Sequence, residues 1–481
     1  MYSLFSLDKV LIVKVLPASR SEHADVRVEN ASRYLIYCYT IERQLMRIMA
    51  AKFVDTSQWD FKRQLAQDMW ETSRHADALR TRALELRFPR RDVDKKPNAD
   101  RLTLMAEYAK SKDTEEFIGG VYGALLPELL RTYQNYLEQT DQLDDAPTVF
   151  ILRHIAADKE GQIEHMRSLT EQISPNLFAD TSDWQDYLRQ LSASIGGISG
   201  LETFVPKPSD HPLAGRPAYA VGRSVQRDAR WRPALFHLPH ENKFDVEGRK
   251  AWQRIESLDK RVAMQVWSAI SHFNEIWAAE VVAASIWDFD NQPWDFYLDL
   301  ARWAWDETRH STMGYRALQG WGWDVPELIP WGNALYNAMG PMPPIQRLAL
   351  LYFYEDSLLR AGVKQIEIKI LESAQDDGGV QDMDFDWADE AIHVSYGYTW
   401  LRHLLGDSNA GKTELTRLTD EARDPVARFV ADHKDKPEAK LAPYFDRLYD
   451  VISAMLKEIP DDHLEFQWAP VVADDEVLKA L

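Results

Sequence analysis

The stretches DETRHSTMGY (residues 306–315) and DEAIHVSYGY (residues 389–398) share one pattern, Asp-Glu-x-x-His-x-x-x-Gly-Tyr. On a helix, residues three positions apart lie on the same face. Glu307 and His310 therefore point the same way from one predicted helix, and Glu390 and His393 point the same way from another. A carboxylate and an imidazole on one helix face are candidate metal ligands, and their repetition makes a metal site the favoured interpretation.

A single glutamate precedes each copy of the pattern at a similar spacing. Glu275 lies 32 residues before Glu307, and Glu355 lies 35 residues before Glu390. Such a spacing corresponds to about one long helix, a short turn and most of a second helix. Four helices that supply two Glu-x-x-His pairs and two single glutamates are the architecture of dinuclear iron and manganese sites. The predicted metal ligands, which we also expect to form the catalytic centre, are Glu275, Glu307, His310, Glu355, Glu390 and His393.

Residues next to these ligands leave some alternatives open. Asp306 and Asp389 can accept the outer ring N–H of a metal-bound histidine on the neighbouring helix, or they are exposed helix carboxylates. Gly314 and Gly397, one turn beyond each histidine, leave room for a substrate or O2, or they allow close helix packing. Glu280 is an alternative to Glu275, but it has no counterpart after Glu355.

The doubled pattern resembles that of the ferritin-like di-metal carboxylate superfamily. It is most similar to the oxygen-activating branch, which includes bacterial multicomponent monooxygenases and the small subunit of class I ribonucleotide reductase. The resemblance covers about 150 residues of the second half. It departs from the reductase subunit, which keeps its radical tyrosine one turn past the first histidine, where this chain has Gly314. A ribonucleotide reductase role is therefore not expected.

Composition excludes several other classes of site and partner. The net charge of −20 argues against nucleic acid and anionic membrane surfaces as partners. Cys38 is the single cysteine, so no internal disulfide and no cysteine-rich metal site is expected, which fits a cytoplasmic protein. The first residues lack a basic region before their apolar part, so they are a poor signal peptide, and residues 8–15 are predicted to form a short strand.

An internal repeat extends beyond the motif. Residues 56–75 (TSQWDFKRQLAQDMWETSRH) align without a gap on residues 291–310 (NQPWDFYLDLARWAWDETRH). We therefore predict an all-α chain of two tandem ferritin-like four-helix bundles that arose by duplication. In this register the first copy has Thr40, Thr72 and Gln162 where the second has Glu275, Glu307 and Glu390. The first bundle is expected to bind no metal, with His75 and His165 as buried core residues.

Four domains follow from this interpretation. Residues 1–175 are predicted to form the bundle without an intact metal site, and residues 251–410 the bundle with the dimetal site. Residues 176–250 form an irregular Pro- and Gly-rich connector or lid, and residues 411–481 a helical extension. The arginines of the connector (Arg223, Arg227, Arg230 and Arg232) contact an anionic ligand or pair with acidic helix faces.

The expected function is that of a non-haem dinuclear iron oxidase or monooxygenase that uses O2 on a small organic substrate. Two iron ions are the expected cofactor, with Mn/Fe and two manganese ions as alternatives. An external electron donor, a reductase or ferredoxin, is expected because no flavin, nicotinamide or cysteine motif is present. The alternative function is ferritin-like metal binding or iron handling without oxygenase activity. A homodimer is an open alternative for the assembly.

Overall fold

The computed structural model describes residues 26–94 and 98–458, and every regular element in these ranges is helical. The all-α prediction is therefore confirmed for this part of the chain. None of the described helices is both long and apolar enough to cross a membrane. The strand predicted at residues 8–15 lies outside the described residues.

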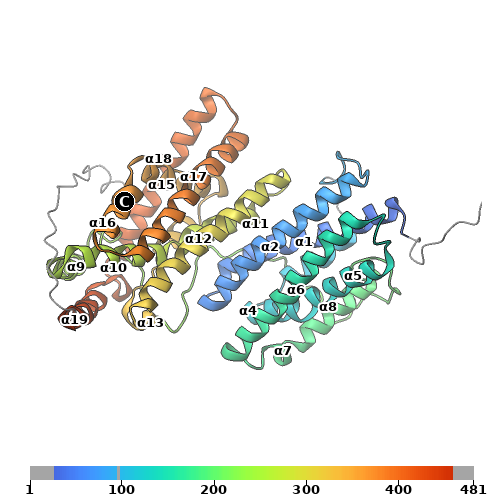
Figure 1. The fold of residues 1–481 in the computed structure, drawn as a ribbon, viewed down its shortest axis with the longest axis horizontal. Coiled ribbons are helices and arrows are strands. Elements are labelled where there is room, and N and C mark those ends of the chain that lie inside the picture. The colour runs from blue at the N-terminus through green and yellow to red at the C-terminus, as the bar shows by residue number, and fades with distance from the viewer. Residues whose placement is uncertain (1–25, 95–97, 459–481) are drawn as a thin grey trace, which may run out of the picture.

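The N-terminal helices form one group of closely packed elements, on the right in Figure 1. Helix α2 packs between α1 and α6, and α5 packs along α6. The elements of this group are α1 (Val28–Asp55), α2 (Trp59–Glu85), α3 (Ala99–Ala109), α4 (Thr114–Gly120), the π-helical turn η1 (Val121–Leu125), α5 (Leu126–Gln139), α6 (Ala146–Ile173), α7 (Leu177–Asp180) and α8 (Ser182–Ser194).

The C-terminal helices form a second group, on the left in Figure 1. Its centre consists of α10, α11, α12, α15 and α17, which pack along one another. The elements of this group are α9 (Val246–Leu258), α10 (Lys260–Asn274), α11 (Ile276–Asp288), α12 (Trp294–Gly320), α13 (Val325–Leu328), α14 (Ala334–Met339), α15 (Pro344–Arg360), α16 (Val363–Ser373), α17 (Asp377–Leu405), α18 (Asn409–His433), the 3-10 turn η2 (Pro437–Ala439) and α19 (Ala442–Glu458).

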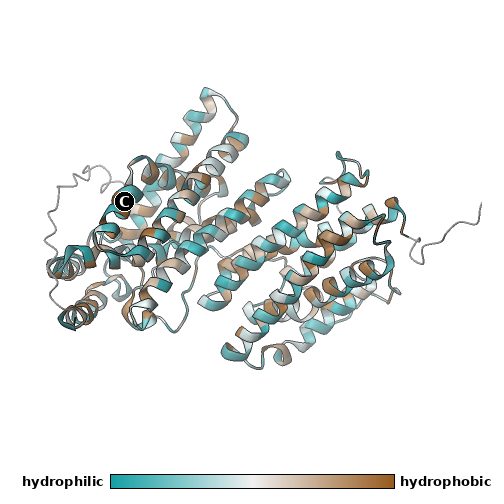
Figure 2. Ribbon diagram, viewed as in Figure 1, coloured by the Kyte–Doolittle hydropathy of each residue, from teal (hydrophilic) through white to brown (hydrophobic). Residues whose placement is uncertain are grey.

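The two groups pack against each other along two pairs of helices, α1 with α11 and α2 with α12. Hydrophobic and hydrophilic positions alternate along these helices in Figure 2, as expected for amphipathic helices. A buried cluster of charges also joins the groups. Glu280 lies 2.6 Å from Lys62 Nζ and 2.6 Å from Arg227 Nη1. Glu280 is thus a structural partner of the first group.

Local sequence signals explain where the central helices begin. The Asp259 carboxylate accepts the backbone N–H groups of Arg261 and Val262 at the start of α10. The Asp376 side chain caps α17 in the same way. Helix α15 begins at Pro344, where a missing N–H costs nothing because the first turn has no internal partner for it.

Hydrophobic periodicity in the sequence predicts continuous helices over residues 256–286 and 343–375, and the structure interrupts both. The helix predicted over residues 256–286 is split at Glu275 into α10 and α11. Just before the break, the Asn274 side chain donates to the backbone oxygens of Ile270 and Pro330, which holds the chain there. The helix predicted over residues 343–375 is split by Gly362, whose φ of 68° ends α15. Both predictions of an unbroken helix were wrong.

The connector is a packed irregular segment. Within residues 195–245, Tyr219 Oη donates to Ala51 O, and the backbone N–H of Val225 donates to Asn337 Oδ1. Four of its arginines, for which an anionic ligand and acidic helix faces were the two alternatives, all pair with carboxylates, so the pairing alternative is the one observed. The pairs are Arg223 with Asp288, Arg227 with Glu280, Arg230 with Asp60 and Asp228, and Arg232 with Glu327.

Candidate metal centre

The structure brings the six candidate ligands together in the centre of the second group. They come from the α10–α11 junction (Glu275), α12 (Glu307 and His310), α15 (Glu355) and α17 (Glu390 and His393). Ligand atoms within 4.8 Å of one another form overlapping groups, Glu307–Glu355–Glu390–His393, Glu275–Glu307–His310 and His310–Asp386–Glu390. Glu307 and Glu390 each belong to more than one of these groups. The cluster therefore has two adjacent sides with shared carboxylates.

Both histidines turn Nδ1 toward the carboxylates. His310 Nδ1 lies 3.5 Å from Glu275 Oε2 and 3.7 Å from Glu307 Oε2. His393 Nδ1 lies 3.1 Å from Glu307 Oε1 and 3.6 Å from Glu390 Oε2. Trp303 stacks on the His393 ring, with 5.3 Å between ring centroids, and donates its indole N–H to Glu307.

The outer nitrogen of each imidazole faces the aspartate of the other motif. His310 Nε2 lies 3.4 Å from Asp389 Oδ2, and His393 Nε2 lies 3.5 Å from Asp306 Oδ2. Both aspartates are buried. They are held by Arg302 and Arg309, each of which contacts both carboxylates. The predicted alternative of exposed aspartates is therefore wrong.

Several buried polar atoms of this cluster have no hydrogen-bond partner within the described chain. A native interior leaves few buried polar atoms unpaired, because each costs free energy. The unpaired atoms of the cluster are Glu275 Oε2, His310 Nδ1, Asp386 Oδ1, Glu390 Oε2, His393 Nδ1 and His393 Nε2. All six atoms belong to residues of the candidate ligand groups, and His393 Nε2 is the one that faces Asp306. Oxygen-rich donors with two imidazoles fit divalent or trivalent iron or manganese.

The pKa values of the cluster follow from burial and from its crowded charges. Burial raises the pKa of Glu355 well above its usual value, and the nearby Glu390 and Glu307 raise it further. Burial lowers the pKa of His310 and His393, but the surrounding carboxylates outweigh burial and raise both values. Protons on Glu355, His310 and His393 thus offset the negative charge of the buried carboxylates. A bound cation would displace these protons.

Three residues of the cluster were missed by the sequence prediction. They are Asp386, Lys364 and His272. Asp386 Oδ1 lies 3.3 Å from His310 Nδ1. Its other oxygen pairs with the Lys364 ammonium and lies 3.1 Å from His272 Nε2. Asp386 could have been found, because it precedes Glu390 by four positions and so shares its helix face. Lys364 had no such signal, because it reaches the cluster only through the break at Gly362.

The glycines of the two motifs, Gly314 and Gly397, allow close packing of helices. A Cβ on Gly314 would lie 2.3 Å from the backbone nitrogen of Phe273 in α10. A Cβ on Gly397 would lie 2.6 Å from the Tyr352 ring in α15. Both helices therefore approach closely at a glycine, and the packing alternative explains both positions.

The corresponding place in the first group contains a buried lysine. Lys159 Nζ lies 2.9 Å from Glu42 Oε2 and donates to Thr72 Oγ1 and to Gln162 Oε1. Thr72 and Gln162 are the positions aligned with Glu307 and Glu390. His75 is buried and lies 2.9 Å from Asp158, as predicted for a core residue. His165 is exposed, so its assignment to the core was wrong.

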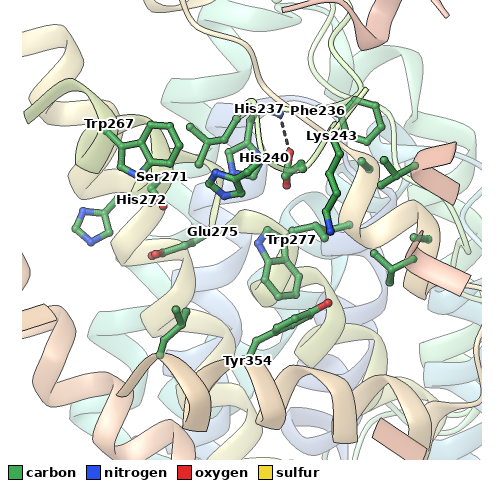
Figure 3. Close-up of a pocket in the computed structure, with 18 of the residues that line it drawn as sticks. Phe236, His237, His240, Lys243, Trp267, Ser271, His272, Glu275, Trp277 and Tyr354 are labelled. Carbon is green, nitrogen blue, oxygen red and sulfur yellow. Dashed lines mark hydrogen bonds and ion pairs between the residues drawn. The ribbon is translucent and has the colours of Figure 1, made fainter. Parts of the chain in front are cut away.

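A cavity of about 430 Å³ lies beside the metal-ligand cluster. Figure 3 shows Glu275 on its wall, with His272 on one side and Trp277 on the other. A smaller space of about 50 Å³ lies among Glu275, Glu307, Glu355 and Glu390. Five residues line both spaces and form the wall between them: Glu275, Trp277, Tyr354, Leu358 and Lys364.

Comparison with known proteins yields one similarity. Residues 223–447 match a family model described as a protein of unknown function, DUF455. This match includes all six candidate ligands and ends before α19 is complete. No curated protein and no solved structure matches the chain.

Proposed function

We propose that the chain is an O2-dependent oxidase or monooxygenase with a dinuclear metal centre. The observation that carries this proposal is the set of buried, unpaired ligand atoms on four helical segments around one point. Leaving so many polar atoms unpaired in an interior is unfavourable, and metal ions would satisfy them together. Two iron ions are the proposed cofactor, and Mn/Fe or two manganese ions would fit the same donors.

The residues have distinct proposed roles. Six residues would hold the ions: Glu275, Glu307, His310, Glu355, Glu390 and His393. Asp306 and Asp389 would hold the Nε2 protons of the imidazoles and thereby keep the Nδ1 lone pairs directed inward. When bound, such a pair of ions supplies the electrons that activate O2 for oxidation of an organic substrate. The surrounding apolar side chains would exclude water from the centre.

The adjacent cavity favours oxidation of an organic molecule over metal storage. A cavity of about 430 Å³ falls in the size range of small-molecule sites. It shares Glu275 with the ligand cluster, so a bound molecule would lie next to the centre. Storage has no need of such a chamber. An external electron donor, a reductase or ferredoxin, would complete the reaction, because the sequence has no motif for a redox cofactor of its own.

We also infer that the two helical groups are tandem ferritin-like four-helix bundles derived from one duplicated unit. The aligned residues 56–75 and 291–310 support this inference. A further correspondence is the pairing of His75 with Asp158, which resembles that of His310 with Asp386. In the first bundle the ammonium of Lys159 would take the place of the metal charge. A single catalytic centre per chain follows.

The test is anaerobic loading of the purified chain with Fe(II), followed by exposure to O2 under optical spectroscopy. We expect about two irons per chain and a transient absorbing species after mixing with O2. Glu355→Ala and His393→Ala should lose iron and the transient. The control His75→Ala, in the first group, should keep both. Iron binding without any O2-dependent transient would instead favour metal handling, and equal iron loss in the control would refute the assignment.

A further inference from the structure

The cavity beside the cluster opens to solvent at a rim with two cationic side chains. Its exposed lining residues are Lys243, Phe244, Arg423 and Ala427. The Lys243 side chain points into the cavity in Figure 3. Arg423 lies on α18 with its guanidinium 4.8 Å from the centre of the Phe353 ring. The rim therefore presents positive charge on an apolar surface.

These two cations have no carboxylate partner among residues 26–94 and 98–458. Their charges are therefore not neutralised by a neighbouring carboxylate, in contrast to those of Arg223, Arg227 and Arg230 in the connector. A third cation, Lys434, lies near the rim with its Nζ 4.7 Å from the centre of the Phe244 ring. Unpaired cations at a cavity entrance attract anionic ligands.

The interior of the cavity is mainly apolar. Trp267, Leu335 and Tyr354 are among its lining residues. Two of the three lining carboxylates have a partner or belong to the candidate metal centre: Glu241 lies 2.8 Å from His237 Nδ1, and Glu275 is a candidate metal ligand. Burial raises the pKa of the third, Glu367, which favours its neutral form. The exposed charged residues of the lining, Lys243 and Arg423, are both cationic, whereas Glu275 and Glu367 are less exposed.

We propose that the cavity binds an organic anion with an apolar body, a carboxylate or phosphate monoester, whose head group contacts Lys243 and Arg423. Arginine suits this role because its guanidinium can donate two parallel hydrogen bonds to either head group. The apolar body lies along Trp267 and Tyr354 and ends near Glu275. The assignment of such an anion as the substrate rests on the proposed function, whereas the binding of the anion to the cavity does not.

The test is calorimetric titration of the metal-free full chain with three probes that share one body: 2-naphthoate, 2-naphthylmethanol and 2-naphthylmethylammonium. We expect 2-naphthoate to bind at least about tenfold more tightly than the other two, because only it gains charge-assisted hydrogen bonds. The double variant Lys243→Gln/Arg423→Gln should lose that preference while keeping its affinity for 2-naphthylmethanol. Titration with 2-naphthyl phosphate identifies the preferred head group, because its affinity can be compared with that of 2-naphthoate.

Two matched variants locate the effect. Arg428→Gln/Lys436→Gln removes the same charge from exposed positions outside the cavity lining and should leave 2-naphthoate binding unchanged. Leu335→Trp fills the cavity and should abolish binding of every probe. Equal binding of the three probes, or an equal loss in both double variants, would overturn the proposal. Because no metal is present, anion binding can succeed even if the Fe(II) and O2 experiment fails, and the reverse outcome is equally recognisable.

Discussion

At the scale of single residues, each imidazole of the centre has an inner and an outer partner. The inner Nδ1 faces glutamates, and the outer Nε2 faces an aspartate from the other motif. The aspartates are in turn held by Arg302 and Arg309. In the proposed centre this arrangement would fix the tautomer that a metal ligand requires, and it would account for the Asp immediately before Glu in each motif.

The first prediction concerns this outer contact. Asp389→Asn should weaken metal binding by about 10- to 100-fold, because the amide holds the His310 N–H less strongly than a carboxylate. Metal affinity is measured by competition with a chelator. Asp299→Asn is the control, since Asp299 lies on α12 but accepts a hydrogen bond from Trp400. Equal effects of the two substitutions would contradict the assigned role.

A second prediction concerns a buried carboxyl far from the centre. Burial raises the pKa of Asp68 to about 7, although Tyr122 and Gln64 donate to it. Because the folded pKa exceeds the unfolded one, its contribution is full below the unfolded pKa and is lost as the pH rises toward 7. The free energy of unfolding should therefore fall by roughly 3 kcal/mol between pH 5 and pH 8 from this residue alone.

The Asp68→Asn variant provides the measurement for this prediction. Its urea unfolding at the two pH values should lack that decrease, because an amide does not ionise. The comparison uses the difference between wild type and variant at each pH, so that other carboxylates cancel. An identical pH dependence in both proteins would show that Asp68 ionises normally.

At the scale of elements, interruptions of helices position part of the candidate metal-ligand cluster. Glu275 lies at the junction of α10 and α11, and the break at Gly362 lets α16 bring Lys364 to Asp386. Regular spacing predicts which residues share a face of an uninterrupted helix. The pairs Glu307/His310 and Glu390/His393 could therefore be predicted from the sequence. Neither break follows from local periodicity. Asn274 is held by Pro330, and this tertiary contact is invisible in the sequence.

A prediction at this scale tests the close approach of α10 and α12. Gly314→Ala places a Cβ against the backbone of α10 and should destabilise the fold by roughly 1–3 kcal/mol, with weaker metal binding because Glu275 moves away. Gly320→Ala, on the same helix but with open space around it, is the control and should not destabilise. Thermal unfolding and metal affinity are measured together. Normal metal binding in Gly314→Ala would show that this contact does not position the ligand.

At the scale of the whole molecule, the two helical groups share a buried charge cluster. Glu280 is fully buried between Lys62 and Arg227, and burial, which raises its pKa, is outweighed by these two cations, so its pKa is lowered. Burial lowers the pKa of Lys62 to about 8, against the opposing effect of Glu280. Glu280, which the sequence offered as an alternative to Glu275 among the metal ligands, therefore has a structural role as the partner of two buried cations.

Glu280→Gln should destabilise the chain by about 3–5 kcal/mol, because it leaves two buried cations without a counter-charge. The protein that remains folded should bind as much metal as the wild type, since Glu280 is not a ligand. Glu414→Gln, which removes an exposed partner of Arg417, should leave the urea midpoint unchanged. Loss of metal in folded Glu280→Gln would restore Glu280 as a ligand candidate.

Features that depend on neighbouring residues could be predicted from the sequence, whereas features that depend on contacts between distant segments could not. Hydrophobic periodicity, a local signal, predicts helices over residues 31–53, 58–87 and 294–319, and α1, α2 and α12 lie within a few residues of these bounds. Helix α3 was missed, since it lies beside a charged, Pro-containing stretch. The cavity and its rim join loop 236–244 to α18, a contact between distant segments that no local pattern encodes.

Anomalous X-ray scattering at the iron edge, from crystals loaded with Fe(II) without O2, would locate the ions of the proposed dinuclear centre. We expect two anomalous peaks among Glu307, Glu355 and Glu390, one near His310 and one near His393, and no peak near Lys159. A peak outside this cluster, a site within the first helical group, or no bound iron in well-ordered crystals would contradict this expectation.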